Sequence, residues 1–202
     1  MSVSGGGSVS FRAAAIHYAW RGWVLGALLA AVAYARWRSH APLQPAWLGL
    51  AAAGLWWRWL AGRHISGHSN GPGWAGPELA VGGPYRYGRH PLYLSNLAVI
   101  SGLVLYAQCL SAWGAASALA IAFAHHSLLA RYEERYLAAA PGAAGVAYRS
   151  YMQVTPRWLG LPRGDSAAAA GSAKGAWSRQ GANLLKACAC VILLWLLAVA
   201  PR

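Results

Sequence analysis

Long apolar runs separated by short polar segments constrain this chain more than any other feature of its sequence. A helix that crosses hydrocarbon needs about 20 predominantly apolar residues, and no segment shows the alternation expected of strands. We therefore predict an all-α polytopic integral membrane protein with about five transmembrane helices. The candidate spans lie near residues 20–37, 46–61, 91–112, 113–130 and 184–200.

The charge of the chain fits a membrane better than a nucleic acid. The net charge is +13, from 17 basic and four acidic residues, while only 10% of residues are charged and 57% are apolar. The basic residues lie between apolar runs, where they face anionic lipid, and form no continuous stripe. We predict contact with a lipid bilayer and none with nucleic acid. The three cysteines all lie in apolar runs and predict neither a disulfide framework nor a metal site.

The segments between the spans suggest one membrane domain with additions at both ends. Residues 1–19 predict a flexible tail, and residues 20–160 a domain that contains the polar segments 62–90 and 131–160. The Ala-, Gly- and Ser-rich residues 161–183 predict a linker before an additional C-terminal helix at 184–200. Ala33-Tyr34-Ala35 resembles a signal-peptide cleavage site, but the long charged region and the later spans favour a retained signal anchor.

The distribution of arginines predicts the orientation. The segment after the second span carries Arg63, Arg86 and Arg89, and the turn between the third and fourth spans carries none. The segment after the fourth span is the richest in basic residues, with Arg131, Arg135, Arg149, Arg157, Arg163, Lys174 and Arg179. Basic segments stay in the cytoplasm, so both polar segments are expected at the cytoplasmic face, with the N-terminus inside. Arg36 and Arg38 fall on the opposite face and count against this topology. The Ala-, Gly- and Arg-rich composition, with two lysines, indicates a bacterium and hence its inner membrane.

The stretch GGPYRYGRHPLYLSN, residues 82–96, is unusually rich in polar and aromatic groups for the start of an apolar run. Pro91 suits the first turn of a helix, which would begin near His90 with free backbone donors able to hold an anion. Arginines would add positive charge and tyrosine rings could stack on a ligand. The alternative is an interfacial aromatic belt. The residues concerned are Tyr85, Arg86, Tyr87, Arg89 and Tyr93.

Two later stretches complete the candidate site. Glu133 and Glu134 are half of the acidic residues and should lie at or beyond the cytoplasmic end of the fourth span. They point about 100° apart on a helix, so one is expected to face a site and the other water. The alternative is a solvated face on which Arg131 pairs with Glu134. Tyr148 and Tyr151 are expected on one face of a surface helix.

The order GPYRYGRHPLY, EERYL and Gly-x-x-Tyr-x-x-Tyr resembles the isoprenylcysteine carboxyl methyltransferase family, over roughly residues 80–160. That family belongs to a wider group with membrane phospholipid methyltransferases and bacterial thiol methyltransferases. The resemblance implies an integral membrane enzyme that uses S-adenosylmethionine at a cytoplasmic-face site. It also implies which residues bind the cofactor: Tyr85, Arg89, His90, Pro91, Leu92, Tyr93, Glu133 and Glu134.

The substrate is less well defined than the cofactor. Prenylcysteine enzymes carry an arginine just before the Glu pair, and Arg131 lies near that position while Leu129 occupies the closer one. Arg131 is therefore the candidate for substrate contact. A lipophilic or small-molecule acceptor with a carboxylate, an amine or a thiol remains open. No Gly-x-Gly-x-x-Gly follows a strand, which excludes the soluble dinucleotide-binding route to this cofactor.

Two other classes of function remain as alternatives. Membrane di-iron oxygenases use histidine boxes, and this chain has His64 and His68 at helical spacing and the pair His125-His126. Gly67 weakens a helix through the first pair, and seven histidines are few for such a site. A non-enzymatic polytopic membrane protein is the second alternative.

Overall fold

The computed structural model describes residues 21–65, 79–161 and 176–199. In these ranges the chain is helical and contains no strand, which confirms the all-α prediction. The predicted tail at residues 1–19 lies outside the described residues. The helices are α2 (Arg21–Arg38), η1 (Pro45–Trp47), α3 (Leu48–Gly62), η2 (Gly83–Arg86), α4 (Pro91–Ala107), α5 (Ala112–Ala138), α6 (Ala143–Val154) and α7 (Ala176–Val199).

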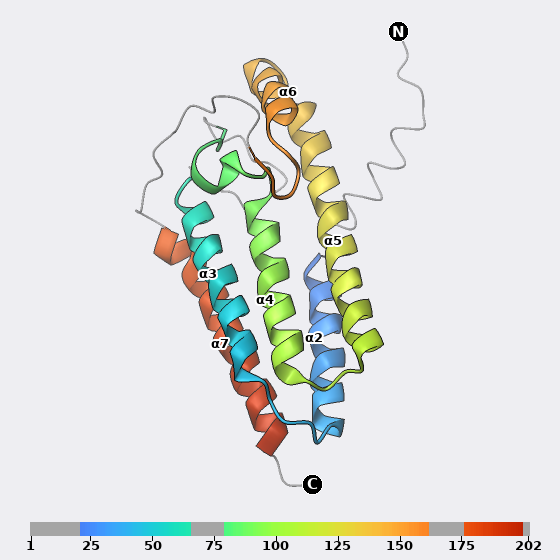
Figure 1. Cartoon of the computed structure of the whole chain (residues 1–202). Helices are drawn as coiled ribbons and strands as arrows, with labels where there is room; N and C mark the ends of the chain where they lie inside the picture. The colour runs from blue at the N-terminus through green and yellow to red at the C-terminus, as the bar shows by residue number, and fades with distance from the viewer. Residues whose placement is uncertain (1–20, 66–78, 162–175, 200–202) are drawn as a thin grey trace.

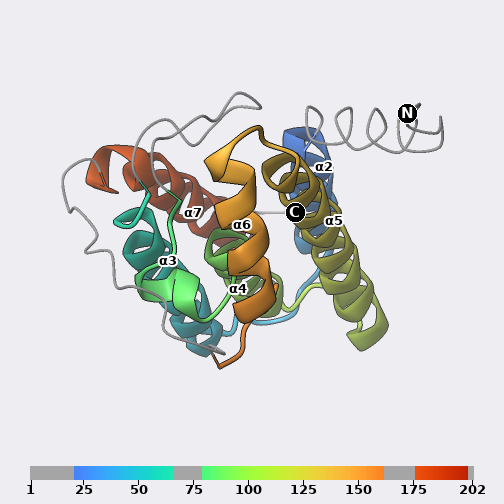
Figure 2. The same ribbon diagram turned by 90° about the horizontal axis from the view of Figure 1, so that it is seen from above.

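Helices α2, α3, α4, α5 and α7 form a bundle in which successive helices run in opposite directions (Figure 1). Helix α5 extends beyond its neighbours and meets α6, and η2 lies at the same end of the bundle. Figure 2 shows α6 lying over this end. We call it the polar end, because the polar segments 79–90 and 131–161 meet there. The alternating direction of the helices brings these two segments together.

The α3–α4 pair is held close by glycines. A Cβ atom on Gly54 would lie 2.9 Å from the Ser95 carbonyl oxygen, and one on Gly102 would lie 2.7 Å from the Ala51 nitrogen. Such contacts leave no room for a side chain, as in the small-residue interfaces of membrane helices. Pro91 occupies the first turn of α4 with His90 as its N-cap, as predicted for the third span.

The turn between α4 and α5 differs from the predicted division at residues 112–113. Gln108 ends α4 in the left-handed conformation at φ 47°, and the Ser111 side chain accepts a hydrogen bond from the Gly114 nitrogen at the start of α5. A serine N-cap satisfies a backbone donor that would otherwise be unpaired. Helix α5 then continues without a break to Ala138, well past the fourth predicted span. Gly142, at φ 69°, precedes α6.

Arg36, which counted against the predicted topology, has a structural role. Its side chain is 2% exposed and donates hydrogen bonds to the carbonyls of Ala41 at 2.7 Å and Ala107 at 2.9 Å. Ala107 is the last residue of α4, whose final carbonyls have no partner within the helix. Arg36 therefore caps α4 at the end of the bundle opposite the polar end. This hydrogen bond explains why an arginine lies at that end.

The apolar helices differ in whether they are long and apolar enough to cross a membrane. Among the described residues, only α5 is both long and apolar enough to cross a membrane. Pro91–Ala107 and Leu184–Val199 are shorter apolar helices. The last helix also begins at Ala176, inside the segment predicted as a linker, while residues 162–175 of that segment lie outside the described ranges.

Candidate functional site

The two polar segments are joined by their backbones. The Arg89 nitrogen donates to the Pro156 carbonyl at 3.0 Å, and the Gly160 nitrogen donates to the Tyr87 carbonyl at 2.8 Å. Gly88 lies between them, where any Cβ atom would overlap the Trp158 carbonyl. The glycine is required because the strap at residues 155–160 crosses directly over it. This contact fixes the N-terminal entrance of α4 against the segment after α6.

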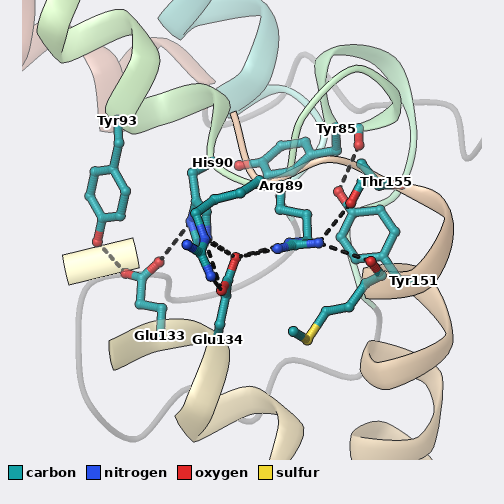
Figure 3. A network of polar contacts seen from close by, with 10 residues as sticks. Tyr85, Arg89, His90, Tyr93, Glu133, Glu134, Tyr151 and Thr155 are labelled. Carbon is teal, nitrogen blue, oxygen red and sulfur yellow. Dashed lines mark hydrogen bonds and ion pairs between the residues drawn. The ribbon is translucent and has the colours of Figure 1, made fainter. Parts of the chain in front are cut away.

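Glu134 is the centre of a buried ion cluster (Figure 3). Its side chain is 4% exposed. Arg89 donates to Oε1 from Nε at 2.9 Å and from Nη2 at 2.7 Å. Arg157 reaches Oε2 from Nη2 at 2.6 Å, and His90 Nε2 lies 3.2 Å from Oε1. Two guanidinium groups and an imidazole therefore saturate this carboxylate, which joins α5 to the strap and to the segment between η2 and α4.

Arg89 makes four hydrogen bonds within the protein. Beyond its bonds to Glu134, its Nη1 donates to the carbonyls of Met152 at 2.9 Å and Thr155 at 2.7 Å. These carbonyls belong to the end of α6, where backbone acceptors lack helical partners. Arg89 therefore positions α6 and the strap.

Glu133 points to a different side of α5 from Glu134. The Tyr93 hydroxyl donates to Glu133 Oε1 at 2.5 Å, and His90 Nδ1 lies 3.6 Å from Oε2. The Glu133 side chain is 35% exposed, against 4% for Glu134. We predicted that one carboxylate faces a site and the other faces water. In the structure, Glu134 is instead buried in ion pairs, and Glu133 is the partly exposed carboxylate. Glu133 is the carboxylate that is open to a ligand.

Aromatic rings surround this open carboxylate. His90 stacks on Tyr93 with ring centroids 5.5 Å apart, and the Trp158 ring lies 6.3 Å from His90 and 5.3 Å from Phe123. His126 meets Tyr93 edge-on at 5.5 Å. Aromatic faces next to a carboxylate suit a ligand that has both a flat ring and a positive charge.

Tyr85 and the two tyrosines of α6 form the support beneath the site. Tyr85, Tyr148 and Tyr151 are all buried, and the Tyr151 hydroxyl donates to the Tyr85 carbonyl at 2.6 Å. Tyr148 and Tyr151 do share one face of the helix. Burial is the main cause that raises the pKa of the Tyr85 and Tyr151 hydroxyls, so both stay neutral.

The structure gathers most of the predicted site residues at the polar end, but some in unexpected roles. The Tyr93 and Leu94 nitrogens both donate to the His90 carbonyl at 3.1 Å, so the first turn of α4 has fewer free donors than expected. Arg131 is exposed and lines a pocket of about 380 Å³ that borders the ion cluster, with Glu134, Arg135 and Arg157 in its wall. It forms no ion pair with Glu134 in the described part of the chain, because Arg89 and Arg157 occupy that carboxylate.

Sequence reasoning missed several residues of the site. Arg58 of α3 donates to the Asn96 Oδ1 at 2.7 Å and to the Leu92 carbonyl at 3.3 Å. Asn96 in turn lies 3.3 Å from His126 Nε2. A charged residue inside an apolar run was the available signal for Arg58. The other missed residues are Arg157 and Trp158.

The histidine pairs are not gathered into one site. His126 Nδ1 bonds the Ala122 carbonyl at 2.8 Å, and His64 Nδ1 bonds the Leu60 carbonyl at 3.0 Å. Within the described ranges, no group of three His, Cys, Asp or Glu side chains is placed to hold a metal ion. His68 lies outside those ranges.

Protonation of His90 should stabilise the fold. Burial by itself lowers the pKa of His90, but its bonds to Glu133 and Glu134 outweigh burial and raise the pKa above its ordinary value. The resulting stabilisation is complete below about pH 6.5, the pKa in the unfolded chain. It is lost as pH rises through the raised pKa of the folded state. The stability advantage of wild type over His90→Gln should therefore shrink above about pH 6.5. Thermal unfolding across pH checks this, and parallel curves for the two proteins would contradict it.

The described residues form a helical bundle with a charged and aromatic cluster at one end, and comparison with known proteins shows what this arrangement is similar to. Residues 49–142 match the model of the phospholipid methyltransferase family. This match confirms the resemblance predicted from the sequence over these residues. The matched residues include nearly all of α3 and all of η2, α4 and α5, and thus both Glu133 and Glu134.

A curated relative is the cobalt-zinc-cadmium resistance protein CzcN of Cupriavidus metallidurans. It is 34% identical to this chain over 134 residues, which cover 64% of this chain and 56% of the relative. The chain thus spans little more than half the length of that relative. No solved structure gives a significant match.

Proposed function

We propose that this chain is an S-adenosylmethionine-dependent methyltransferase that acts on a lipophilic acceptor at the cytoplasmic face of a bacterial inner membrane. The family match supports methyl transfer in a membrane. The exposure of the Glu133 carboxylate is the observation on which the assignment of the site rests. Glu133 is a partly exposed carboxylate between His90 and Tyr93, in a cluster where the other carboxylate is saturated.

The residues present fit the cofactor. S-adenosylmethionine supplies an electrophilic methyl group on a positively charged sulfur. Glu133 can accept hydrogen bonds from the amino or hydroxyl groups of this ligand. The rings of Tyr93 and Trp158, which both lie against His90, offer faces for its adenine and its positive charge. Arg89, Glu134 and Arg157 hold these groups in place.

Methyl transfer by this site depends on alignment. Displacement at a carbon bound to sulfur needs the acceptor in line with the bond that breaks, and water kept away. The ion cluster of Glu134 rigidly joins α5 to the strap that carries Trp158. The protein therefore orients the donor with Glu133 and its aromatic neighbours, and shields it with Trp158.

The surface of the bundle supports a position within the bilayer. Large apolar side chains are exposed along α5 and α7, including Ile121, Phe123, Ile192 and Trp195. Apolar surface of this extent indicates lipid contact. Arginines gather at the polar end, while Arg36 at the other end caps a helix. We accordingly propose about five spans, with the polar end and the N-terminus in the cytoplasm.

Binding of S-adenosylhomocysteine to purified protein tests the proposed function. A ligand at about 100 times its Kd stabilises the folded state by about 2.7 kcal/mol, so the unfolding temperature should rise by several degrees. Adenosine and homocysteine at the same concentrations are the controls. Membranes incubated with methyl-labelled S-adenosylmethionine should transfer label to a lipophilic product. No thermal shift at saturating ligand would overturn the cofactor assignment.

A further inference from the structure

The pocket of about 380 Å³ at the polar end lies where α5 meets α6 and the strap. Its lining residues are Arg131, Glu134, Arg135 and Ala138 of α5, Met152 of α6 and Arg157 of the strap. The residues of α5 follow the i, i+3, i+4, i+7 spacing of one helix face. Glu133 is two residues from both Arg131 and Arg135, a rotation of about 200° around the helix, so it points away from this pocket.

The ion cluster of Glu134 separates this pocket from the proposed site of the methyl donor. His90 Nδ1 lies 3.6 Å from Glu133 Oε2, and its Nε2 lies 3.2 Å from Glu134 Oε1. Arg157 binds the other oxygen, Oε2, of Glu134. Glu133 and the pocket therefore lie on opposite sides of the Glu134 carboxylate. The cluster keeps a ligand in the pocket apart from the donor, so the pocket needs a role other than methyl transfer.

The pocket has an excess of positive charge. Three arginines line it, and its one carboxylate, Glu134, is already paired with two arginines. Arg131 and Arg135 are exposed and have no hydrogen-bond or ion-pair partner in the described part of the chain. Arg157 binds Glu134 through Nε and Nη2, which leaves its Nη1 for a ligand. Guanidinium groups gathered around one space match the geometry of a phosphate group.

Arg149 offsets the negative end of α5 next to the pocket. Its Nη1 donates to the Ala138 carbonyl at 2.5 Å, and Ala138 both ends α5 and lines the pocket. The last carbonyls of a helix lack helical partners and carry partial negative charge, which repels an anion. A guanidinium bound to one of them weakens this repulsion. The end of the helix is therefore no obstacle to an anionic ligand in the pocket.

An exposed apolar strip of α5 leads into the pocket. The strip consists of Ile121, Ala124 and Leu128, all exposed, and spacings of three and four residues continue it to Arg131 and Arg135. One face of α5 thus changes from apolar to basic within about one helical turn. The basic part lies at the polar end, where α5 extends beyond its neighbours (Figure 1). This pattern is typical of a helix that leaves the hydrocarbon at the level of the lipid phosphates.

We propose that the pocket binds the phosphate of an anionic phospholipid whose chains lie along the apolar strip, and that this lipid stabilises the polar end without being methylated. The volume holds about twelve water-sized groups of roughly 30 Å³, enough for a phosphate and the glycerol attached to it. A zwitterionic head group would bring an ammonium group to the arginines and is disfavoured. Because Arg157 also binds Glu134, an occupied pocket should hold the strap more firmly. The inference rests on the proposed position in the membrane and is independent of methyl transfer.

Thermal unfolding with defined lipids tests this proposal. In an uncharged detergent, saturating dioleoylphosphatidylglycerol should raise the Tm of the purified protein by several degrees, because a ligand that binds only the folded state stabilises it. Dioleoylphosphatidylcholine has the same chains and no net charge, so it should give a smaller rise. Glycerol 3-phosphate supplies the phosphate without the chains and should also give a smaller rise.

Removal of the two unpaired arginines should weaken the response to the anionic lipid. Arg131→Gln/Arg135→Gln should need at least about tenfold more dioleoylphosphatidylglycerol for the same rise in Tm, because each arginine supplies a charged hydrogen bond to the phosphate. Arg38→Gln/Lys186→Gln removes the same charge from residues outside the pocket and should respond as wild type does. All four side chains are exposed, so both variants should fold.

Four results would overturn the proposal. No rise with dioleoylphosphatidylglycerol would mean that the pocket binds no such lipid. An equal rise with dioleoylphosphatidylcholine would mean that the lipid chains act alone, and an equal rise with glycerol 3-phosphate would mean that the pocket takes soluble phosphates. An equal loss of response in the two double variants would show attraction to net charge and no site. These measurements use neither methyl donor nor acceptor, so their failure is distinct from failure of the proposed function.

Discussion

Replacement of Glu134 with glutamine should lower the free energy of unfolding by about 3–5 kcal/mol, because it leaves buried cations without their counter-ion. Glu134 accepts bonds from both Arg89 and Arg157 and lies beside His90. Glutamine keeps the volume but offers one neutral oxygen and an amide that faces these donors. For a chain of this size, the loss corresponds to a fall in Tm of about 6–20 °C. Thermal unfolding in a detergent that preserves the wild-type fold measures it.

Arg135→Gln is the matched control for this prediction. Arg135 lies one residue further along α5 but is exposed and forms no ion pair in the described part of the chain. Its replacement should change stability by no more than about 0.5 kcal/mol. If Glu134→Gln melts at the same temperature as Arg135→Gln, the ion cluster does not hold the polar end together.

A double-mutant cycle separates the contribution of Arg157. Arg157 is partly exposed and bonds Glu134 through two nitrogens. If it stabilises the strap through this carboxylate, Arg157→Met should cost less in the Glu134→Gln background than in wild type. Arg89 is expected to retain an effect in both backgrounds, since it also binds the carbonyls of Met152 and Thr155.

Features with a local cause could be read from the sequence. Pro91 predicted the start of α4 because a proline suits a first helical turn wherever it occurs. The spacing of Tyr148 and Tyr151 predicted a shared helix face for a similar reason. The position of the α4–α5 turn was missed because the apolar run continues through it. Ser111, a good N-cap, was the signal that could have located it.

The ion-pair and hydrogen-bond partners of residues far apart in the sequence could not be predicted from the sequence. Glu134 was weighed against Arg131, three residues away, but its partners Arg89 and Arg157 lie 45 and 23 residues distant. Arg36 was weighed only as a basic residue that favours the cytoplasmic side. In the structure it donates a hydrogen bond to the Ala107 carbonyl, 71 residues along the chain. Both outcomes depend on how helices pack, because a buried charge takes whichever partner the tertiary structure places nearby.

Glu133→Gln should have the opposite signature to Glu134→Gln, with loss of ligand binding and little loss of stability. The Glu133 side chain is 35% exposed, and the oxygen of a glutamine can still accept from the Tyr93 hydroxyl. A hydrogen bond from a ligand to a charged group is worth about 1.5–3 kcal/mol. The affinity for S-adenosylhomocysteine should therefore fall by roughly 10- to 100-fold. Calorimetric titration of both proteins measures this ratio.

Tyr93→Phe distinguishes direct contact by Glu133 from a general disturbance of the site. It keeps the ring that stacks on His90 and removes only the hydroxyl that orients Glu133. Affinity for S-adenosylhomocysteine should fall less than in Glu133→Gln, because the carboxylate and its charge remain. If Glu133→Gln binds this ligand as wild type does, Glu133 is not its contact. The exposure of Glu133, next to the fully paired Glu134, would then need an explanation other than binding of this ligand.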